Sequence, residues 1–375
     1  MADGSVPYGA TSLGAPAWGT VRHDAELALR WAALASEAVQ PNPFYARFSL
    51  APALDAFSSC GVRLLQLHGN DGLDGLIPLE RSNSYYGRPV PHWRGWLHAN
   101  GFCGAPLVRA GAEERFWREL LHWCDAHAAG AAFLHLTQLP QDGPIYAALR
   151  EVVRQQGRPA AIVQREERAL LSSDLSPDAY LEQALSSKKR KELRRQYRRF
   201  GEEGELRFHR QRDGEGLARW TRDFLALEQA GWKGREGSAL ACASDTRAMF
   251  ERTLKGAASE GVLERLSFTL DGRPIAMLAN FLTPPGAFSF KTAYDERFAR
   301  FSPGVLLQRE NLALLDEADI DWTDSCAAAD HPMIDSLWTE RRSIVRVSIA
   351  IGGSARRMLA RAIFRAEAGS EGMSL

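Results

Sequence analysis

The chain has 375 residues and a mass of 41.5 kDa, which predicts two or three domains at roughly 150 residues per domain. With 45% hydrophobic and 25% charged residues, the composition excludes an intrinsically disordered or collagen-like protein. Lys plus Arg and Asp plus Glu each total 46, so no net field draws the chain to nucleic acid or anionic lipid. Any electrostatic partner must be recognised by a local patch.

The cysteines and histidines indicate neither disulfides nor a metal site. The five cysteines are widely spaced and contain no C-x-x-C pair: Cys60, Cys103, Cys124, Cys242 and Cys326. This pattern is typical of a reducing compartment. None of the nine histidines forms a metal-binding motif, and no stretch reaches the ~18 apolar residues of a membrane span. We therefore expect a cytoplasmic protein without metal.

The first half of the chain alternates helices and strands. Residues 1–20 are rich in Gly, Ala, Ser and Pro and predict a loose tail. Apolar periodicity and turn residues then predict helices at 25–39, 113–127 and 145–156, and strands at 62–68, 76–80, 133–136 and 160–164, with a turn-rich connection at 69–75. The helix at 113–127 has a continuous apolar face and must pack on a sheet.

The second half contains the strongest β signal. Strands at 263–270, 274–282 and 287–294, separated by Asp271-Gly272 and a Pro-Pro-Gly turn, predict a three-strand meander. Around it we expect helices at 180–200, 216–229 and 246–259, a helix from 303 to 315, and strands at 206–209, 320–323 and 344–349. Ser302 is the expected N-cap of the helix that Pro303 opens.

The order of elements in the two halves is similar. Asp74-Gly75 and Asp271-Gly272 are separated by the same distance along the chain as Pro106 and Pro303. These landmarks and the matching element order predict an internal duplication of one α/β unit with the same strand order in both sheets.

A dense run of cations occupies residues 188–199, where eight cations accompany one anion. One interpretation is a solvated helix face; the other is an anion site for a phosphorylated cofactor, a polyphosphate, RNA or a lipid surface. The start of the helix at Ser302-Pro303-Gly304 is a second candidate anion site, because a helix N-terminus presents unpaired N–H groups and Gly304 permits close approach. Arg297 and Arg300 precede it.

These segments resemble the GNAT superfamily of acyl-CoA-dependent acyltransferases, and within it the tandem-GNAT, CelD-like branch that is similar to FemABX peptidyltransferases and is linked to polysaccharide biosynthesis. The resemblance covers about residues 170 to 350, and the residues that carry it are 187–195, Glu228, 231–238, 290–295, 302–304, 331–333, 337–338 and 341–342. It implies an α/β (α+β) fold of two GNAT-like units, each a mixed, mostly antiparallel sheet flanked by helices. The implied division is a tail at 1–20, domains at 21–170 and 171–352, and an amphipathic helix with a tail at 353–375.

The resemblance also implies a direct transfer of an acyl group from acyl-CoA to an amine or hydroxyl of a cell-envelope or polysaccharide precursor. In that reaction a backbone N–H stabilises the oxyanion and a base accepts the proton. The implied catalytic residues are Asp295, Glu228, Lys291 and Tyr294; those for the cosubstrate are Met277, Leu278, Ala279, Arg300, Ser302, Pro303 and Gly304; those for the acceptor are Trp232 and Lys233. For Trp232 alone, a place in the core is the favoured interpretation.

The sequence leaves two classes of acyl donor open, acyl-CoA and aminoacyl-tRNA. The usual GNAT pyrophosphate loop reads Gln/Arg-x-x-Gly-x-Gly/Ala, whereas residues 300–305 place a glycine four positions after Arg300. FemABX relatives use aminoacyl-tRNA, which would suit the basic run. A non-catalytic RNA-binding or lipid-binding scaffold is the third alternative.

A last helix is expected at 354–366. Its apolar residues, Ala355, Met358, Leu359, Ala362, Ile363 and Ala366, share one face among four arginines. Docking of this face on its own domain is the favoured interpretation, and a peripheral membrane contact is the alternative.

Overall fold

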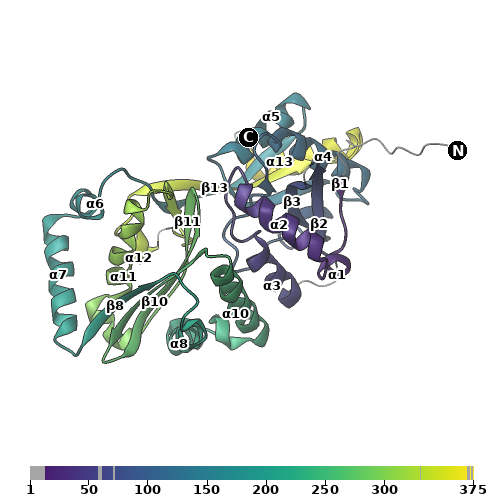
Figure 1. Cartoon of the computed structure of the whole chain (residues 1–375). Helices are drawn as coiled ribbons and strands as arrows, with labels where there is room; N and C mark the ends of the chain where they lie inside the picture. The colour runs from purple at the N-terminus through teal and green to yellow at the C-terminus, as the bar shows by residue number, and fades with distance from the viewer. Residues whose placement is uncertain (1–12, 58–60, 71, 330, 370–371, 373–374) are drawn as a thin grey trace. The chain divides into compact units, whose positions relative to one another are not determined.

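The computed structural model describes residues 13–57, 61–70, 72–329, 331–369, 372 and 375. The chain forms two compact units, one of residues 1–166 and 343–375 and one of residues 167–342 (Figure 1). The expected domains ended at 170 and 352, so the structure differs chiefly in grouping the last strand and last helix with the first unit. Among the described residues, no helix is long and apolar enough to cross a membrane.

The first unit is a mixed sheet with helices. Its sheet has the order β1-β2-β3-β4-β6-β13, with β5 paired to β3. Its strands are Leu13–Gly14 (β1), Arg63–Gly69 (β2), Gly72–Ser82 (β3), His92–Gly95 (β4), Leu107–Val108 (β5), Phe133–Pro140 (β6) and Glu340–Ala350 (β13). Its helices are Trp18–Val21 (α1), Ala25–Glu37 (α2), Arg47–Phe57 (α3), Glu113–Ala126 (α4), Pro144–Gln155 (α5) and Ser354–Ala368 (α13).

The second unit has the sheet order β7-β12-β11-β10-β9-β8. Its strands are Ala160–Leu171 (β7, of which residues 167–171 belong to this unit), Leu206–Gln211 (β8), Leu263–Leu270 (β9), Arg273–Thr283 (β10), Gly286–Tyr294 (β11) and Trp322–Asp324 (β12). Its helices are Pro177–Ala184 (α6), Ser187–Gly201 (α7), Leu217–Ala230 (α8), Trp232–Arg235 (α9), Ser244–Ser259 (α10), Pro303–Asn311 (α11) and Pro332–Asp335 (α12), with 3-10 turns at Leu240–Cys242 (η1), Glu296–Phe301 (η2) and Leu312–Asp316 (η3).

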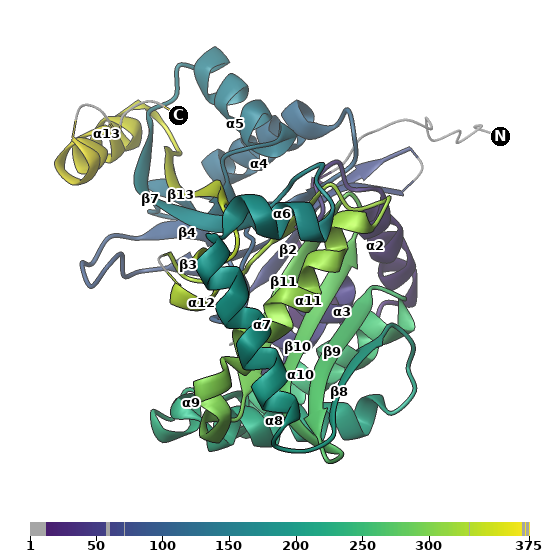
Figure 2. The ribbon, with the colours of Figure 1, turned by 90° about the vertical axis from the view of Figure 1, so that its left-hand side faces the viewer.

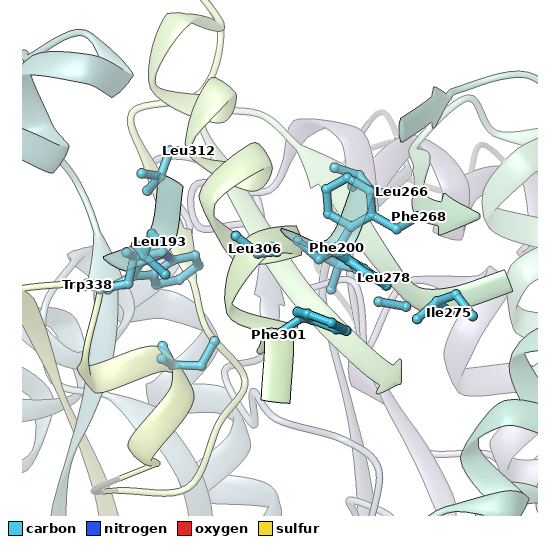
Figure 3. Close-up of a cluster of buried hydrophobic side chains, with 14 of the residues drawn as sticks. Leu193, Phe200, Leu266, Phe268, Ile275, Leu278, Phe301, Leu306, Leu312 and Trp338 are labelled. Atoms are coloured by element: carbon cyan, nitrogen blue, oxygen red, sulfur yellow. The ribbon is translucent and has the colours of Figure 1, made fainter. Parts of the chain in front are cut away.

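Helices cover both faces of the second sheet. Helices α7 and α11 lie on one side of the strands, and α8 and α10 lie on the other (Figures 1 and 2). On the first side, buried side chains from α7, β9, β10 and α11 form one apolar cluster (Figure 3). Phe200 of α7 stacks on Phe301 with ring centroids 5.2 Å apart, which fixes α7 beside the segment that leads into α11.

The two sheets share one strand order, as the predicted duplication requires. In the first unit β2, β3 and β4 are antiparallel, β4 is parallel to β6, and β6 is antiparallel to β13. In the second unit β9, β10, β11, β12 and β7 repeat this pattern. The closing strand of the first sheet comes from the end of the chain, so the expectation that the strand at 344–349 closes the second unit is wrong.

The landmarks that suggested the duplication have different structural roles. Asp74 and Gly75 lie inside β3, whereas Asp271 and Gly272 form a turn with positive φ angles of 50° and 76°. The positive φ angles of Asp271 and Gly272 suit an Asp-Gly hairpin turn. Pro106 precedes β5, and Pro303 opens a helix. The order of elements was therefore informative, while the paired residues coincided by chance.

Three further expectations need correction. The loose tail was predicted to extend to residue 20, but β1 pairs with β2 and Trp18 is buried; residues 1–12 lie outside the described part. The turn predicted for 69–75 is shorter, because β2 ends at Gly69 and β3 begins at Gly72. The single helix predicted over 180–200 is two helices, because Ser186 is extended and its hydroxyl accepts the Lys189 N–H to cap α7.

Candidate functional site

Strand β11 contains a bulge, and its pairing with β12 covers only its first residues. Ala279 of β10 pairs with Lys291, while the next residue, Asn280, pairs with Ser289, so Phe290 is the extra residue of a β-bulge. On its other side β11 pairs with β12 through Gly286, Ala287 and Phe288. The bulge therefore lies just beyond the end of the register with β12.

The central strand β10 is paired along both sides at the predicted cosubstrate residues. Met277, Leu278 and Ala279 pair with β11 on one side and with β9 on the other. Their contact with the cosubstrate stays a prediction. The bulge lies on β11, which sequence periodicity alone does not distinguish from β10.

Lys291 follows the bulge and has an altered basicity. Burial of its ammonium group, together with the positive charge of Lys233, lowers the pKa of Lys291 to about 8. Glu228 and Cys326 act in the opposite direction. At pH 7 roughly one Lys291 side chain in ten is then the neutral amine, which is able to accept a proton.

Glu228 holds the neighbouring loop in place. Its Oε1 accepts a hydrogen bond from Nζ of Lys233 at 2.9 Å, and its Oε2 accepts the Leu240 N–H at 2.8 Å. The carboxylate is buried at the end of α8 and has both oxygens engaged. These contacts favour a positioning role for Glu228, which holds Lys233 near Lys291.

Cys326 and His331 follow β12, the neighbour of β11; Cys326 acts on Lys291, and the charge of Lys233 acts on His331. Cys326 is buried, has a φ of 51°, and follows β12, where Asp324 accepts its backbone N–H. Burial and the charge of Lys233 lower the pKa of His331, and within the described residues its Nδ1 is buried with no hydrogen-bond partner. No motif in the sequence links Cys326 to Lys291. Sequence patterns alone therefore do not distinguish Cys326 from the other four scattered cysteines.

Trp232 and Tyr294 lie at the rim of the site. The Trp232 side chain is 47% exposed, so the favoured placement in the core is wrong. Its backbone N–H donates to Glu296 at 2.7 Å. Tyr294 ends β11 and is half-buried. A hollow of about 540 Å³ is lined by residues of this rim: Asp223, Ala226, Leu227, Ala230, Gly231, Arg235, Pro274, Tyr294, Asp295, Glu296 and Arg297.

Asp295 is held by its neighbour Arg297. The carboxylate accepts the Arg297 backbone N–H at 3.0 Å and the guanidinium at 2.6 Å. These hydrogen bonds lower the pKa of Asp295, so the carboxylate is a weaker base than an ordinary aspartate. The contacts favour Lys291 over Asp295 as the group that accepts a proton.

The start of α11 differs from the expected cap. Ser302 has φ 52° and ψ 52°, and its hydroxyl makes no bond to an α11 N–H; it accepts instead from Nε2 of Gln196 at 3.3 Å. Pro303 has no N–H to offer. A Cβ added at Gly304 would lie 2.6 Å from Sδ of Met333 and 3.3 Å from the Tyr294 ring. Met333 and Tyr294 therefore occupy the space beside Gly304.

The basic helix α7 meets the same segment. Arg300 stacks on Phe301 at 4.6 Å and pairs with Glu203 at 2.9 Å. A second hollow, of about 300 Å³, is lined by Glu192, Arg195, Gln196, Arg199, Glu202, Glu203, Arg300 and Phe301. Three arginines thus converge beside the start of α11, although Arg195 also pairs with Glu192 at 2.8 Å. Three glutamates share this lining with the three arginines, so binding of donor phosphates here stays a prediction.

A buried polar chain supports the bulge from within. Glu264 accepts hydrogen bonds from Arg210 at 3.0 Å and from Asn280 at 2.9 Å. Asn280 also donates to Asn311 at 2.7 Å, Asn311 donates to Gln308 at 3.2 Å, and Gln308 donates to Ser289 at 3.4 Å. The chain therefore connects the two residues that pair across the bulge, Asn280 and Ser289, to α11. No group of three or more metal-ligating side chains was found in the described part of the protein.

Residues 187–331 match the family model described as an acetyltransferase (GNAT) domain. No curated protein matches the chain. Among solved structures, the chain is similar to FemX with a TM-score of 0.58 at 12% identity, covering 90% of this chain and 98% of that one. It is similar to a C-terminal domain named for a lysylphosphatidylglycerol synthetase from Agrobacterium fabrum, with a TM-score of 0.54 at 14% identity and 94% and 99% coverage. A conserved protein of unknown function from Bacteroides thetaiotaomicron gives 0.51 at 11% identity, with 88% and 98% coverage.

These comparisons confirm the GNAT resemblance for the second unit. At such low identities the structural likenesses show the fold alone, and they extend over both units. The predicted α/β fold of two GNAT-like units is thereby confirmed.

Proposed function

We propose that this chain, which contains a GNAT acetyltransferase domain at residues 187–331, transfers an acyl group from acyl-CoA to an amine or hydroxyl of a cell-envelope or polysaccharide precursor. The observation that carries the proposal is the bulge of β11, just beyond the end of its pairing with β12, with the partly neutral amine of Lys291 beside it. A backbone donor and a base at one place are what direct acyl transfer requires.

The proposed reaction is a single displacement. The nitrogen or oxygen of the acceptor attacks the acyl carbonyl carbon, a new bond to the acyl group forms, and the bond to the thiol leaving group breaks. A backbone N–H at the bulge of β11 stabilises the developing oxyanion. Neutral Lys291 takes the proton of the acceptor, and His331 is the second group able to do so because its lowered pKa keeps it neutral.

The remaining residues of the site have binding roles in this proposal. Lys233, held by Glu228, suits a carboxylate or phosphate on the acceptor. Trp232 offers an exposed ring for stacking on a sugar or another planar group. Tyr294 lies beside Gly304 at the start of α11, and Arg300 would hold a phosphate of the donor. The cytoplasmic location expected from the scattered cysteines belongs to the same proposal.

An aminoacyl-tRNA donor is the second candidate. The observation in its favour is the convergence of Arg195, Arg199 and Arg300 beside the start of α11. A guanidinium-rich helix fits a polynucleotide backbone as well as it fits the few phosphates of CoA. The third candidate, a non-catalytic scaffold that binds RNA or lipid, predicts binding without turnover.

Ligand-induced stabilisation separates these candidates. We expect acyl-CoA at 100 times its dissociation constant to stabilise the protein by about 2.7 kcal/mol, measured as a rise in melting temperature. Acetyl-CoA, longer acyl-CoAs, charged tRNA and uncharged tRNA form the panel. Stabilisation by charged tRNA alone would contradict the acyl-CoA proposal and select the second candidate.

The salt dependence of binding gives an independent answer. Each phosphate that the protein neutralises contributes a slope of about −0.7 to −0.9 in log K against log salt, so tRNA gives a steep dependence and CoA a shallow one. Replacing Arg194, Arg195, Arg198 and Arg199 by Gln abolishes tRNA binding if α7 contacts the nucleic acid. We expect weak tRNA binding in the wild type and a modest effect of these substitutions on acyl transfer.

A further inference from the structure

The last helix, α13, presents an apolar stripe to solvent. Met358 is 67% exposed and Leu359 is 56% exposed, although both are large apolar side chains. Ala355, Ala362 and Ala366 are exposed as well and share this side of the helix at helical spacing. The face that was expected to dock on the first unit is therefore directed mainly outward.

The opposite side of α13 is what holds the helix on the first unit. Ala360 and Phe364 are buried in a cluster with Phe133, and the rings of Phe364 and Phe133 lie 5.5 Å apart. Arg357 donates to Asp125 at 3.1 Å and to the carbonyl of Gly352 at 2.9 Å. The helix is anchored by packing and hydrogen bonds, so its outward stripe is not needed for docking within the unit.

Charge on α13 is arranged around the stripe. Arg361 and Arg365 are exposed one turn apart, adjacent to Met358 and Ala362 on the helix surface, and Arg356 is exposed on the other flank. Glu367, the one carboxylate in the sequence of this helix, accepts a hydrogen bond from the Tyr85 hydroxyl at 2.9 Å. The side chains that surround the stripe are therefore cationic.

We propose that this outward face of α13, formed by Ala355, Met358, Leu359, Ala362 and Ala366 with Arg356, Arg361 and Arg365, binds the surface of an anionic membrane. An apolar stripe bordered by arginines is the pattern of a helix that lies in the interface plane, with its apolar side chains among the acyl chains and its guanidinium groups at the headgroups. Met358 and Leu359 supply the insertion, and the arginines supply the attraction to negative lipids. The inference does not depend on the reaction proposed above.

Cosedimentation of the full chain with vesicles tests the proposal. We expect binding to vesicles of equimolar phosphatidylcholine and phosphatidylglycerol, weak binding to phosphatidylcholine alone, and loss of binding as salt increases. Met358→Ser with Leu359→Ser should weaken binding at least about tenfold. Arg361→Gln with Arg365→Gln should weaken vesicle binding about thirty-fold, because both arginines lie near the membrane surface and contribute similar shares of the attraction to anionic lipid.

Matched controls use other exposed residues of the first unit. Leu29 of α2 is 75% exposed, and Leu29→Ser should leave vesicle binding unchanged. Arg150→Gln with Arg154→Gln, on α5, should have at most a small effect. Equal binding to both kinds of vesicle, or binding that the α13 variants leave intact, would overturn the proposal. Self-association that Met358→Ser and Leu359→Ser abolish, without vesicle binding, would assign the face to a second copy of the chain.

Discussion

The Lys291 side chain is partly buried and lies near the cationic Lys233. The titration of Lys291 is therefore the most direct test of the proposed reaction. Its pKa is lowered to about 8, so the neutral amine increases about tenfold per pH unit below that value. We expect kcat/KM to rise with pH and to level off above about 8. The pH profile with a saturating acyl donor measures this dependence.

The variant Lys291→Arg separates the base from the charge. Arginine keeps the positive charge but does not release a proton near neutral pH. We expect a loss of at least about 100-fold in kcat/KM and disappearance of the rise toward pH 8. Lys255→Arg, at an exposed position of α10, is the matched control. An unaltered pH profile in Lys291→Arg would exclude Lys291 as the base.

Gly304 tests the start of α11 as a phosphate site. Even a Cβ at Gly304 would contact Met333, so alanine is the smallest probe of this position. We expect Gly304→Ala to lower CoA affinity about tenfold in calorimetric titration, because the methyl group obstructs the helix N–H groups. The double variant Gly304→Ala with Met333→Ala should restore the melting temperature but not the affinity. Recovery of affinity in the double variant would remove this helix end from the donor site.

At the scale of elements, the bulge in β11 depends on the polar chain beneath it. Asn280→Ala removes two hydrogen bonds and leaves the buried Glu264 carboxylate short of a donor. We expect a loss of about 2–3 kcal/mol in the free energy of unfolding, measured by urea denaturation. Thr253→Ala, at a buried hydroxyl outside this chain, should cost less than about 1 kcal/mol. Equal effects of the two substitutions would show that the chain contributes no more than an average buried polar group.

Turns and helix starts were predicted correctly where residues at the boundary itself favour them. The Asp271-Gly272 turn and the helix opened by Pro303 were predicted correctly. The break between α6 and α7 was missed, because leucine and cation spacing on either side continues a helical pattern. Ser186 was the available signal, since its hydroxyl is a preferred cap two residues before the cationic run that begins at Lys188.

At the scale of the whole molecule, the two units differ in chain continuity. Residues 167–342 form the second unit from one continuous segment, whereas the first unit needs residues 343–375 in addition to 1–166. Without β13, strand β6 loses its antiparallel partner, and without α13 the cluster around Phe133 loses Phe364. We expect a fragment of residues 167–342 to unfold cooperatively and a fragment of residues 1–166 to aggregate or remain unfolded.

Circular dichroism and thermal melting of the two purified fragments measure this difference. Addition of a peptide covering residues 340–369 to the first fragment should restore a cooperative transition, because it supplies both missing elements. A cooperative transition of residues 1–166 alone would contradict the division into units.

The sequence by itself determined the positions of the major helices and strands, the meander of β9 to β11 and the segments that carry the GNAT resemblance. These features depend on periodicity, turn residues and caps, which act over a few residues. The tertiary structure decided which strand closes each sheet, where Phe290 forms a bulge, and where the pairing of β11 with β12 ends. It also brought Cys326 close to Lys291 and His331 close to Lys233, and turned Met358 outward. Ladder register, burial and the field of distant charges set these features, and each depends on residues that are far apart in the chain.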